Sequence, residues 1–257
     1  MRKPLLFCCA LLALAAPMAF AGLDLTAVAC NTNTTPPPST TFLFDCANPG
    51  VPQTVFACFQ TRTNEDSVFA LDSRLELGVA DPRLPEWWHF EAATQFEPAG
   101  CNASGWSADV VQSPSLCSGA TNPWGTQPSI TWAYGPLMRF GPNTGHFFVS
   151  QETSPQAPIT LDAGTNYFAF NLNFFADNAT QSGGACAGCG IGAVLVWTSA
   201  IVINIRAAAQ TGAEANPVLI SGPGLVSDCL VWGSGGVPCG AVPTGNRTWG
   251  QLKSLYR

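Results

Sequence analysis

The residues with the clearest chemical potential lie in one short aromatic segment, Glu86-Trp87-Trp88-His89-Phe90-Glu91. On an extended strand Trp87, His89 and Glu91 would share a face, because alternate side chains project to the same side. A carboxylate beside a histidine can orient the imidazole as a general base. His89 and Glu91 are therefore the candidates for a catalytic pair in a hydrolase. The simpler interpretation, a half-exposed polar face beside packed tryptophans, is the one we expect.

Other catalytic patterns are weaker. The remaining histidine, His146, opens an apolar run after a turn and is expected to be an ordinary hairpin residue. No G-x-S-x-G nucleophile elbow is present. Two carboxylate pairs, Glu65 with Asp66 and Glu86 with Glu91, have the residue types of a glycosidase. Sixteen acidic residues offer many accidental pairs, so we expect no enzyme and no cofactor.

Tryptophans are dense between residues 87 and 132. Exposed planar rings on secreted β-sandwiches can stack on sugars, while buried rings serve the core. Trp87, Trp106 and Trp124 are the candidate ligand-binding residues of a carbohydrate-binding module. Trp88 would face away from Trp87 on a strand, so at least one ring should be buried.

The chain has eleven cysteines, of which Cys8 and Cys9 lie in the N-terminal apolar run. Without these two, nine remain, and an odd number leaves at least one thiol unpaired or bonded between chains. The sequence does not determine connectivity, but turn-rich segments between neighbouring cysteines favour local disulfides. The expected pairs are Cys30–Cys46, Cys101–Cys117, Cys186–Cys189 and Cys229–Cys239. Cys58 lies in the strand-like run 55–59 and is the expected buried free thiol.

Cys186-Ala187-Gly188-Cys189 is the sharpest local motif, and three interpretations are open. A redox-active C-x-x-C opens a helix after a strand, whereas this one has glycine-rich flanks. A zinc site needs a second pair of ligands, and the residues near Asp177 lack the spaced oxygens of a calcium loop. We expect a structural disulfide and no metal site.

The N-terminus has the pattern of a secretory signal peptide. Arg2 and Lys3 precede an apolar run of about 16 residues, short for a membrane span of roughly 20, and Ala19-Phe20-Ala21 fits a cleavage site. We expect a signal peptide at 1–21, an irregular lead-in at 22–50, one β-domain at 51–247 and a short helix at 248–257. The mature chain would be secreted or held at the cell surface or in the periplasm, without a membrane span.

Composition narrows the class further. Charged residues make up 10% of the chain and hydrophobic residues 47%, which argues against disorder. Without Arg2 and Lys3, eight basic residues face sixteen acidic ones, a formal charge of −8. Nucleic acids and anionic membranes require basic patches. We therefore expect neither as a partner, and a protein or a glycan instead.

Short strand-like segments recur between turns. The clearest are 55–60, 67–80, 130–134, 146–151, 167–175 and 192–205; Trp87–Ala92 also reads as a short strand, and 218–220 and 230–232 are weaker. No long 3.6-residue periodicity lies between them. This pattern predicts an all-β fold, an antiparallel β-sandwich or jelly roll with disulfide-stapled loops. At the C-terminus Thr248 and Gln251 form a capping box ahead of a short helical face.

The chain resembles a set of exported bacterial β-sandwich proteins that have no assigned activity. The residues that carry this resemblance are the segment 84–90 leading to Cys101, the run 161–170, Ala185-Cys-Ala-Gly-Cys189 and the tail 248–257. The resemblance implies bacterial origin and export, and brings no catalytic residues. The expected function is that of an exported, non-catalytic surface or extracellular interaction module. The alternatives are a carbohydrate-binding module and a secreted hydrolase using His89.

Overall fold

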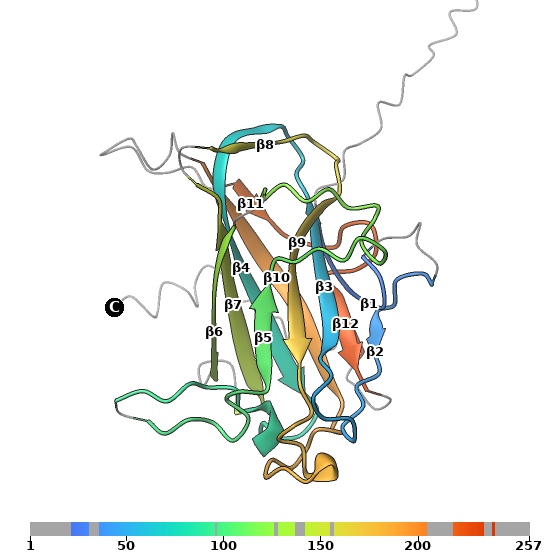
Figure 1. Cartoon of the computed structure of the whole chain (residues 1–257), viewed down its shortest axis with the longest axis vertical. Coiled ribbons are helices and arrows are strands. Elements are labelled where there is room, and N and C mark those ends of the chain that lie inside the picture. The colour runs from blue at the N-terminus through green and yellow to red at the C-terminus, as the bar shows by residue number, and fades with distance from the viewer. Residues whose placement is uncertain are drawn as a thin grey trace, which may run out of the picture.

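The computed structural model describes residues 22–30, 36–95, 97–125, 128–136, 142–154, 157–204, 218–233 and 238–239. Within these ranges the chain forms two sheets packed face to face, the all-β sandwich that the strand pattern predicts (Figure 1). The expected signal peptide and the expected C-terminal helix lie outside the described residues. No helix among the described residues is long and apolar enough to cross a membrane.

The smaller sheet has four antiparallel strands, in the order β1 (Gly22–Ala27), β3 (Gln53–Gln60), β9 (Tyr167–Phe174) and β5 (Trp106–Asp109). β1 was expected to be part of an irregular lead-in, and this expectation is wrong. All six of its residues are buried and pair with β3 from Gly22↔Gln60 to Ala27↔Val55. The lead-in therefore supplies an edge strand of the sandwich.

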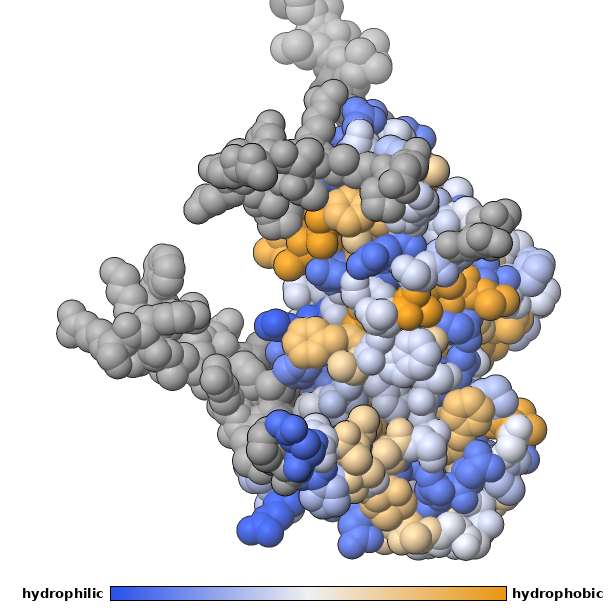
Figure 2. All heavy atoms as spheres, turned by 60° about the vertical axis from the view of Figure 1, so that its left-hand side comes forward, coloured by the Kyte–Doolittle hydropathy of each residue, from blue (hydrophilic) through white to orange (hydrophobic). Residues whose placement is uncertain are grey.

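The larger sheet has eight strands. Its main path runs β2 (Thr41–Phe42), β12 (Cys229–Trp232), β10 (Ala193–Asn204), β4 (Glu65–Val79), β7 (Thr144–Glu152) and β6 (Ser129–Pro136). β11 (Val218–Ile220) pairs with β10, and β8 (Ile159–Leu161) pairs with β4. All of these pairs are antiparallel except β2–β12. On the side of the molecule that carries β6, hydrophobic residues lie in separate patches between hydrophilic ones (Figure 2).

The strand segments predicted from the sequence correspond to β3, β4, β6, β7, β9, β10, β11 and β12. On β4 exposed Asp72 and Arg74 alternate with buried Leu71 and Leu75, because one face of the sheet is covered and the other is wet. β9 is buried on both faces. The loop at 110–121 covers its outer face, where Phe168 packs in a cluster with Cys117.

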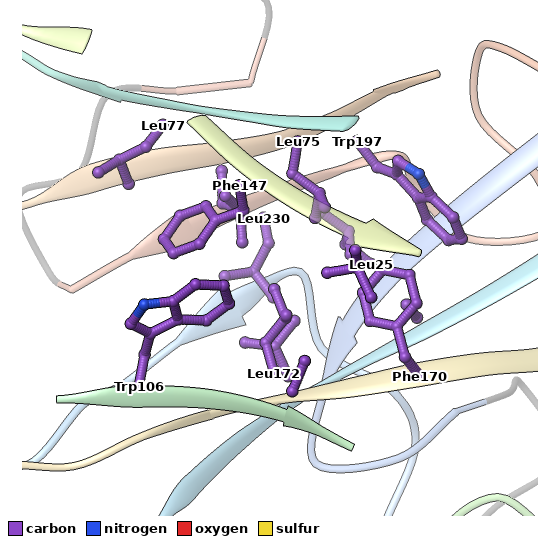
Figure 3. Packing of buried hydrophobic residues seen from close by; sticks show 14 of the residues in the cluster. Leu25, Leu75, Leu77, Trp106, Phe147, Phe170, Leu172, Trp197 and Leu230 are labelled. Carbon is purple, nitrogen blue, oxygen red and sulfur yellow. The ribbon is translucent and has the colours of Figure 1, made fainter. Parts of the chain in front are cut away.

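The core lies between the two sheets. Figure 3 shows Trp106, Phe170 and Leu172 of the smaller sheet facing Phe147, Leu75 and other residues of the larger one. Burial of such side chains contributes about 1.5–3 kcal/mol each.

The loops at 43–52, 80–105 and 175–192 leave the sandwich at one end, the lower end in Figure 1. The registers require this, since Gln53 lies opposite Phe174 and Val79 lies opposite Ala193. Residues far apart in the sequence therefore meet at the lower end.

Candidate functional site

The segment that carries His89 and Glu91 lies at the lower end. It does not begin as the expected strand, since Glu86–Trp88 form the 3-10 helix η1. Trp87 and Trp88 are both buried, with ring centroids 4.9 Å apart, and the N–H of Trp87 donates to the carbonyl of Ala187 at 2.8 Å. Two packed indoles and this bond anchor the start of the segment.

Beyond η1 the chain is held extended by a neighbouring stretch. The N–H of Asn102 donates to the carbonyl of His89, and that of Gly100 donates to the carbonyl of Glu91, each at 2.9 Å. Phe90 points into the core and is buried, so His89 and Glu91 share the outward side. Position 100 requires glycine, because a Cβ there would lie 2.4 Å from the backbone carbonyl oxygen of His89.

The side chain of Asn102 holds this segment by a buried hydrogen bond. Its side chain is fully buried, and its Nδ2 donates to the carbonyl of Trp87 at 3.0 Å. Its Oδ1 accepts from Nδ2 of Asn178 at 3.1 Å. One amide therefore ties the η1 segment to the β9–β10 loop. Nothing in the sequence marked Asn102, because an isolated asparagine in a turn-rich stretch has no distinguishing pattern.

His89 and Glu91 are in direct contact, as their spacing predicts. Nδ1 of His89 lies 2.9 Å from Oε1 of Glu91, and the two side chains are 38% and 18% exposed. Oε2 of Glu91 is buried and has no hydrogen-bond partner among the described residues. A carboxylate at Nδ1 favours the tautomer with its proton there, which leaves Nε2 as the basic nitrogen.

Both side chains line an open pocket of about 890 Å³, here called the end pocket. Its ionisable residues are His89 and three glutamates, Glu86, Glu91 and Glu97; neither lysine nor arginine is among the described residues that line it. Its other lining residues are Leu84, Pro98, Ala99, Gly100, Cys101, Pro142, Thr144 and Ala185. In the described part of the chain, no three His, Cys, Asp or Glu side chains are placed to hold a metal ion. The glutamates thus surround a space larger than an ion needs.

The predicted carboxylate pairs divide between the two ends of the fold. Glu86 and Glu91 line the end pocket, whereas Glu65 and Asp66 lie at the start of β4, the opposite end of that strand from Val79. The hydroxyl of Thr63 donates to Glu65. The second pair therefore has no place in this site.

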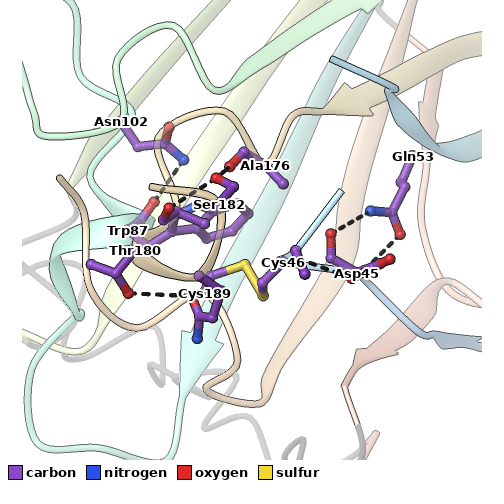
Figure 4. The surroundings of a disulfide bond; sticks show 12 residues. Asp45, Cys46, Gln53, Trp87, Asn102, Ala176, Thr180, Ser182 and Cys189 are labelled. Atoms are coloured by element: carbon purple, nitrogen blue, oxygen red, sulfur yellow. Dashed lines mark hydrogen bonds between the residues drawn. A yellow bond between two sulfur atoms is a disulfide. The ribbon is translucent and has the colours of Figure 1, made fainter. Parts of the chain in front are cut away.

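Two disulfides link the loops at the lower end, and neither was expected; Cys101, in one of them, lines the end pocket. Cys46 bonds Cys189, as Figure 4 shows, and Cys101 bonds Cys186. The redox interpretation of the C-x-x-C motif and the Cys186–Cys189 pair are both wrong, because each cysteine has a partner from another loop. Gly188, at φ +100°, packs so closely on Pro85 that a Cβ would meet its ring carbon at 2.3 Å.

Of the two remaining disulfides, one differs from the expected pairs and one agrees with them. The expected pairs Cys30–Cys46 and Cys101–Cys117 are wrong, since Cys30 bonds Cys117 across 87 residues. Cys229–Cys239 forms as expected. For the other three disulfides local pairing fails, because the sandwich brings loops distant in sequence to the same end or face. Together the four disulfides indicate an oxidising, exported environment.

The expected sugar-binding face is also wrong. Trp87, Trp106 and Trp124 are 0%, 7% and 1% exposed. The first two pack in the aromatic cluster at the lower end of the core, and Nε1 of Trp124 donates to the carbonyl of Phe168 at 3.0 Å. Two large sheets need bulky residues to fill the space between them, and these rings supply that volume. The carbohydrate-binding hypothesis thereby loses the three rings on which it rested.

A second cysteine-rich region lies on the outer face of the smaller sheet. Cys58 is the buried free thiol that was expected, and it packs with Cys30, Cys117 and Phe168. Burial, with a smaller contribution from the charge of Asp24, raises the pKa of Cys58 above its ordinary value. A thiol with a raised pKa forms little thiolate and is a poor nucleophile.

Asp24 lies opposite Cys58 in the β1–β3 register and is buried. Its carboxylate accepts from the backbone N–H groups of Leu225, Val226 and Ser227 at 2.6–2.8 Å. Burial raises the pKa of Asp24, although these bonds act in the opposite direction. Asp24 thus fastens the loop before β12 to β1, and its role is structural.

His146 lies outside both regions, on the outer face of the larger sheet. It is half-buried, lies opposite Glu76 and packs against Phe148 with ring centroids 4.3 Å apart. Partial burial and, to a smaller extent, the charge of Arg74 lower the pKa of His146 from 6.5 to about 4.

Comparisons with protein-family models, with curated proteins and with solved structures found no match for this chain. The resemblance to exported bacterial proteins therefore stays a prediction.

Proposed function

We propose that this protein is an exported, non-catalytic interaction module that binds its ligand in the end pocket. Export would follow cleavage of the signal peptide near Ala21. The observation that carries the proposal is the convergence of four ionisable side chains, Glu86, His89, Glu91 and Glu97, around about 890 Å³ of open space. Two disulfides hold the loops beside it, so ligand binding would cost little ordering entropy.

The ligand class follows from the lining. Three glutamates, with neither lysine nor arginine among the described lining residues, favour a cation. Their spacing does not suit a metal ion, while Leu84, Pro98 and Pro142 offer surface for hydrocarbon. The ligand is therefore an organic cation with an apolar body, either a free amine or amidine or a Lys or Arg side chain of a peptide.

Isothermal titration calorimetry with benzamidine tests this proposal on the mature protein. The expected dissociation constant is about 0.1–1 mM, as suits a ligand of this size. Glu97→Gln should weaken binding at least tenfold, whereas Glu152→Gln, an exposed glutamate on β7, should leave it unchanged. Benzoate, with the same ring and the opposite charge, is the control ligand. No benzamidine binding, or equal binding of benzoate, would contradict the proposal.

A second titration separates the two sources of the cation. Blocked tripeptides with a central lysine or arginine present a cation on a peptide backbone, and the tripeptide with a central norleucine is their uncharged control. Tighter binding of the cationic peptides than of benzamidine would identify a peptide ligand. Tighter binding of benzamidine would identify a small amine or amidine.

One observation favours a secreted hydrolase as the second candidate. The 2.9 Å contact of Glu91 with Nδ1 of His89 leaves Nε2 as a possible base for activating water. Assays on ester, glycoside and peptide panels decide between the two. Turnover by the native protein that falls at least 100-fold in His89→Gln would replace the binding proposal with this one.

A further inference from the structure

The edge of the larger sheet at β6 is unusual for a monomeric protein. β6 ends the sheet and pairs only with β7 among the described strands, without a register shift. Its sequence, Ser-Ile-Thr-Trp-Ala-Tyr-Gly-Pro, has no charged residue. Single-copy proteins commonly protect such edges with lysine, an inward charge or a bulge, because free backbone groups recruit another strand.

The register identifies the backbone groups on the free side of β6. The N–H of Thr153 donates to Phe69 on β4, so odd-numbered residues of β7 face β4 and even-numbered ones face β6. Glu152, Ser150 and Phe148 pair with Ser129, Thr131 and Ala133, whose backbone groups therefore face β7. The N–H and C=O groups of the alternate residues, Ile130, Trp132 and Tyr134, point away from the sheet.

The same edge carries an exposed indole. Trp132 is 45% exposed, whereas every other tryptophan in the described part of the chain is at most 7% exposed. An exposed tryptophan beside an uncharged strand edge is the kind of residue that interfaces use as an anchor. Burying it would remove a large apolar surface from water.

We propose that β6 is a self-association edge, on which a second copy of this chain adds its own β6 antiparallel to the first. With Trp132 on the two-fold axis, Trp132 lies opposite Trp132 and Ile130 lies opposite Tyr134. All three outward residues have both N–H and C=O, so this register forms six backbone hydrogen bonds. The two indoles form a cross-strand aromatic pair.

A second copy is the occupant because the edge complements itself. The two-fold register uses each outward backbone group once and places no proline within the paired stretch. The chain has a net charge of −6, so two copies repel each other at long range. Because β6 has no charged residue, two copies can pair along it without bringing like charges together.

Sedimentation velocity of the mature protein over about 1–500 µM tests the proposal. A reversible monomer–dimer equilibrium is expected, and Trp132→Lys should weaken it at least tenfold by placing two cations at the axis. Thr131→Lys is the matched control, because the backbone of Thr131 faces β7 and its side chain lies on the opposite face from Trp132. It should leave the dimer unchanged.

Hydrogen exchange gives a second measurement that does not depend on a variant. In the dimer the amides of Ile130, Trp132 and Tyr134 should be protected, and this protection should disappear on dilution. A monomer at every concentration, with rapid exchange of these three amides, would overturn the proposal. So would a dimer that Trp132→Lys does not weaken.

Discussion

Two regions of this molecule are held by disulfides that close loops of nearly equal length. One region contains an open pocket, and the other is a buried cluster beneath a loop. Cys101–Cys186 spans 85 residues at the lower end and borders an open pocket lined by His89 and glutamates. Cys30–Cys117 spans 87 residues and presses a loop onto the outer face of the smaller sheet, over Cys58.

The difference lies in what surrounds each bond. At the lower end the linked loops bring charged, half-exposed side chains together, and an aromatic layer beneath them closes the core. On the outer face the loop brings Leu116 and Ala120 against Phe168 and helps to bury Cys58. A disulfide thus fixes loops in place, while the side chains it brings together decide whether a site results.

Removal of each disulfide in turn tests whether the two regions are independent. Cys30→Ser with Cys117→Ser and Cys101→Ser with Cys186→Ser should each lower the free energy of unfolding by up to about 4 kcal/mol, since the loops are equally long. Urea denaturation measures this cost. Only the second variant should also weaken benzamidine binding, by at least tenfold. Equal loss of binding in both would show that the regions are not independent.

Asn102→Ala should have the next largest effect. It removes an amide bonded at both ends and leaves the carbonyl of Trp87 without that donor, at a cost of about 2 kcal/mol. Asn178→Ala, which removes a less buried partner, should cost about 1 kcal/mol. Urea midpoints of the two variants, at unchanged slope, check the order. A smaller cost for Asn102→Ala would contradict its role in tying the η1 segment to the β9–β10 loop.

The burial of Cys58 predicts that its thiol is unreactive. Because Cys58 is fully buried and its pKa is raised, the folded protein should show no reaction with Ellman's reagent over hours. In about 6 M guanidinium one thiol per chain should react. Cys58→Ala serves as the blank and should show no reactive thiol in either state. Rapid reaction of the folded native protein would mean that this region opens.

The smallest effect concerns pH. The folded-state pKa of His146 is lowered to about 4, so the unfolded chain binds the proton more readily between pH 6.5 and 4. The contribution of His146 to stability is therefore present above pH 6.5 and lost as the pH falls to 4. Solvent screening of this half-buried group leaves about 1 kcal/mol.

His146→Gln should remove this loss of stability, as thermal melts across that pH range would show. The buried Asp24 acts in the opposite direction, because its raised pKa makes ionisation in the folded state unfavourable. Asp24→Asn should therefore steepen the decline in the acidic range just above pH 3.8, the ordinary pKa of this carboxyl. An unchanged pH profile in His146→Gln would contradict the assignment.

Much of the architecture was open to prediction because its signals are local. Alternation over a few residues located β4, and runs of β-branched and aromatic residues located β3, β9 and β10. The i, i+2 spacing placed Glu91 on the same side as His89. The strand-like run around Cys58 marked it as the buried free thiol. The signals for β1 were weaker, because Gly22–Ala27 has one β-branched residue and no aromatic residue.

The sequence by itself determined the all-β class, the odd cysteine and the shared side of His89 and Glu91. Only the tertiary structure decided that Cys186 and Cys189 bond different loops, that Trp87, Trp106 and Trp124 are buried and that Trp132 is exposed. The physical reason is the distance along the chain over which each effect acts. Side-chain alternation acts over a few residues, whereas disulfide partners and burial depend on which loops and faces the strand order brings together.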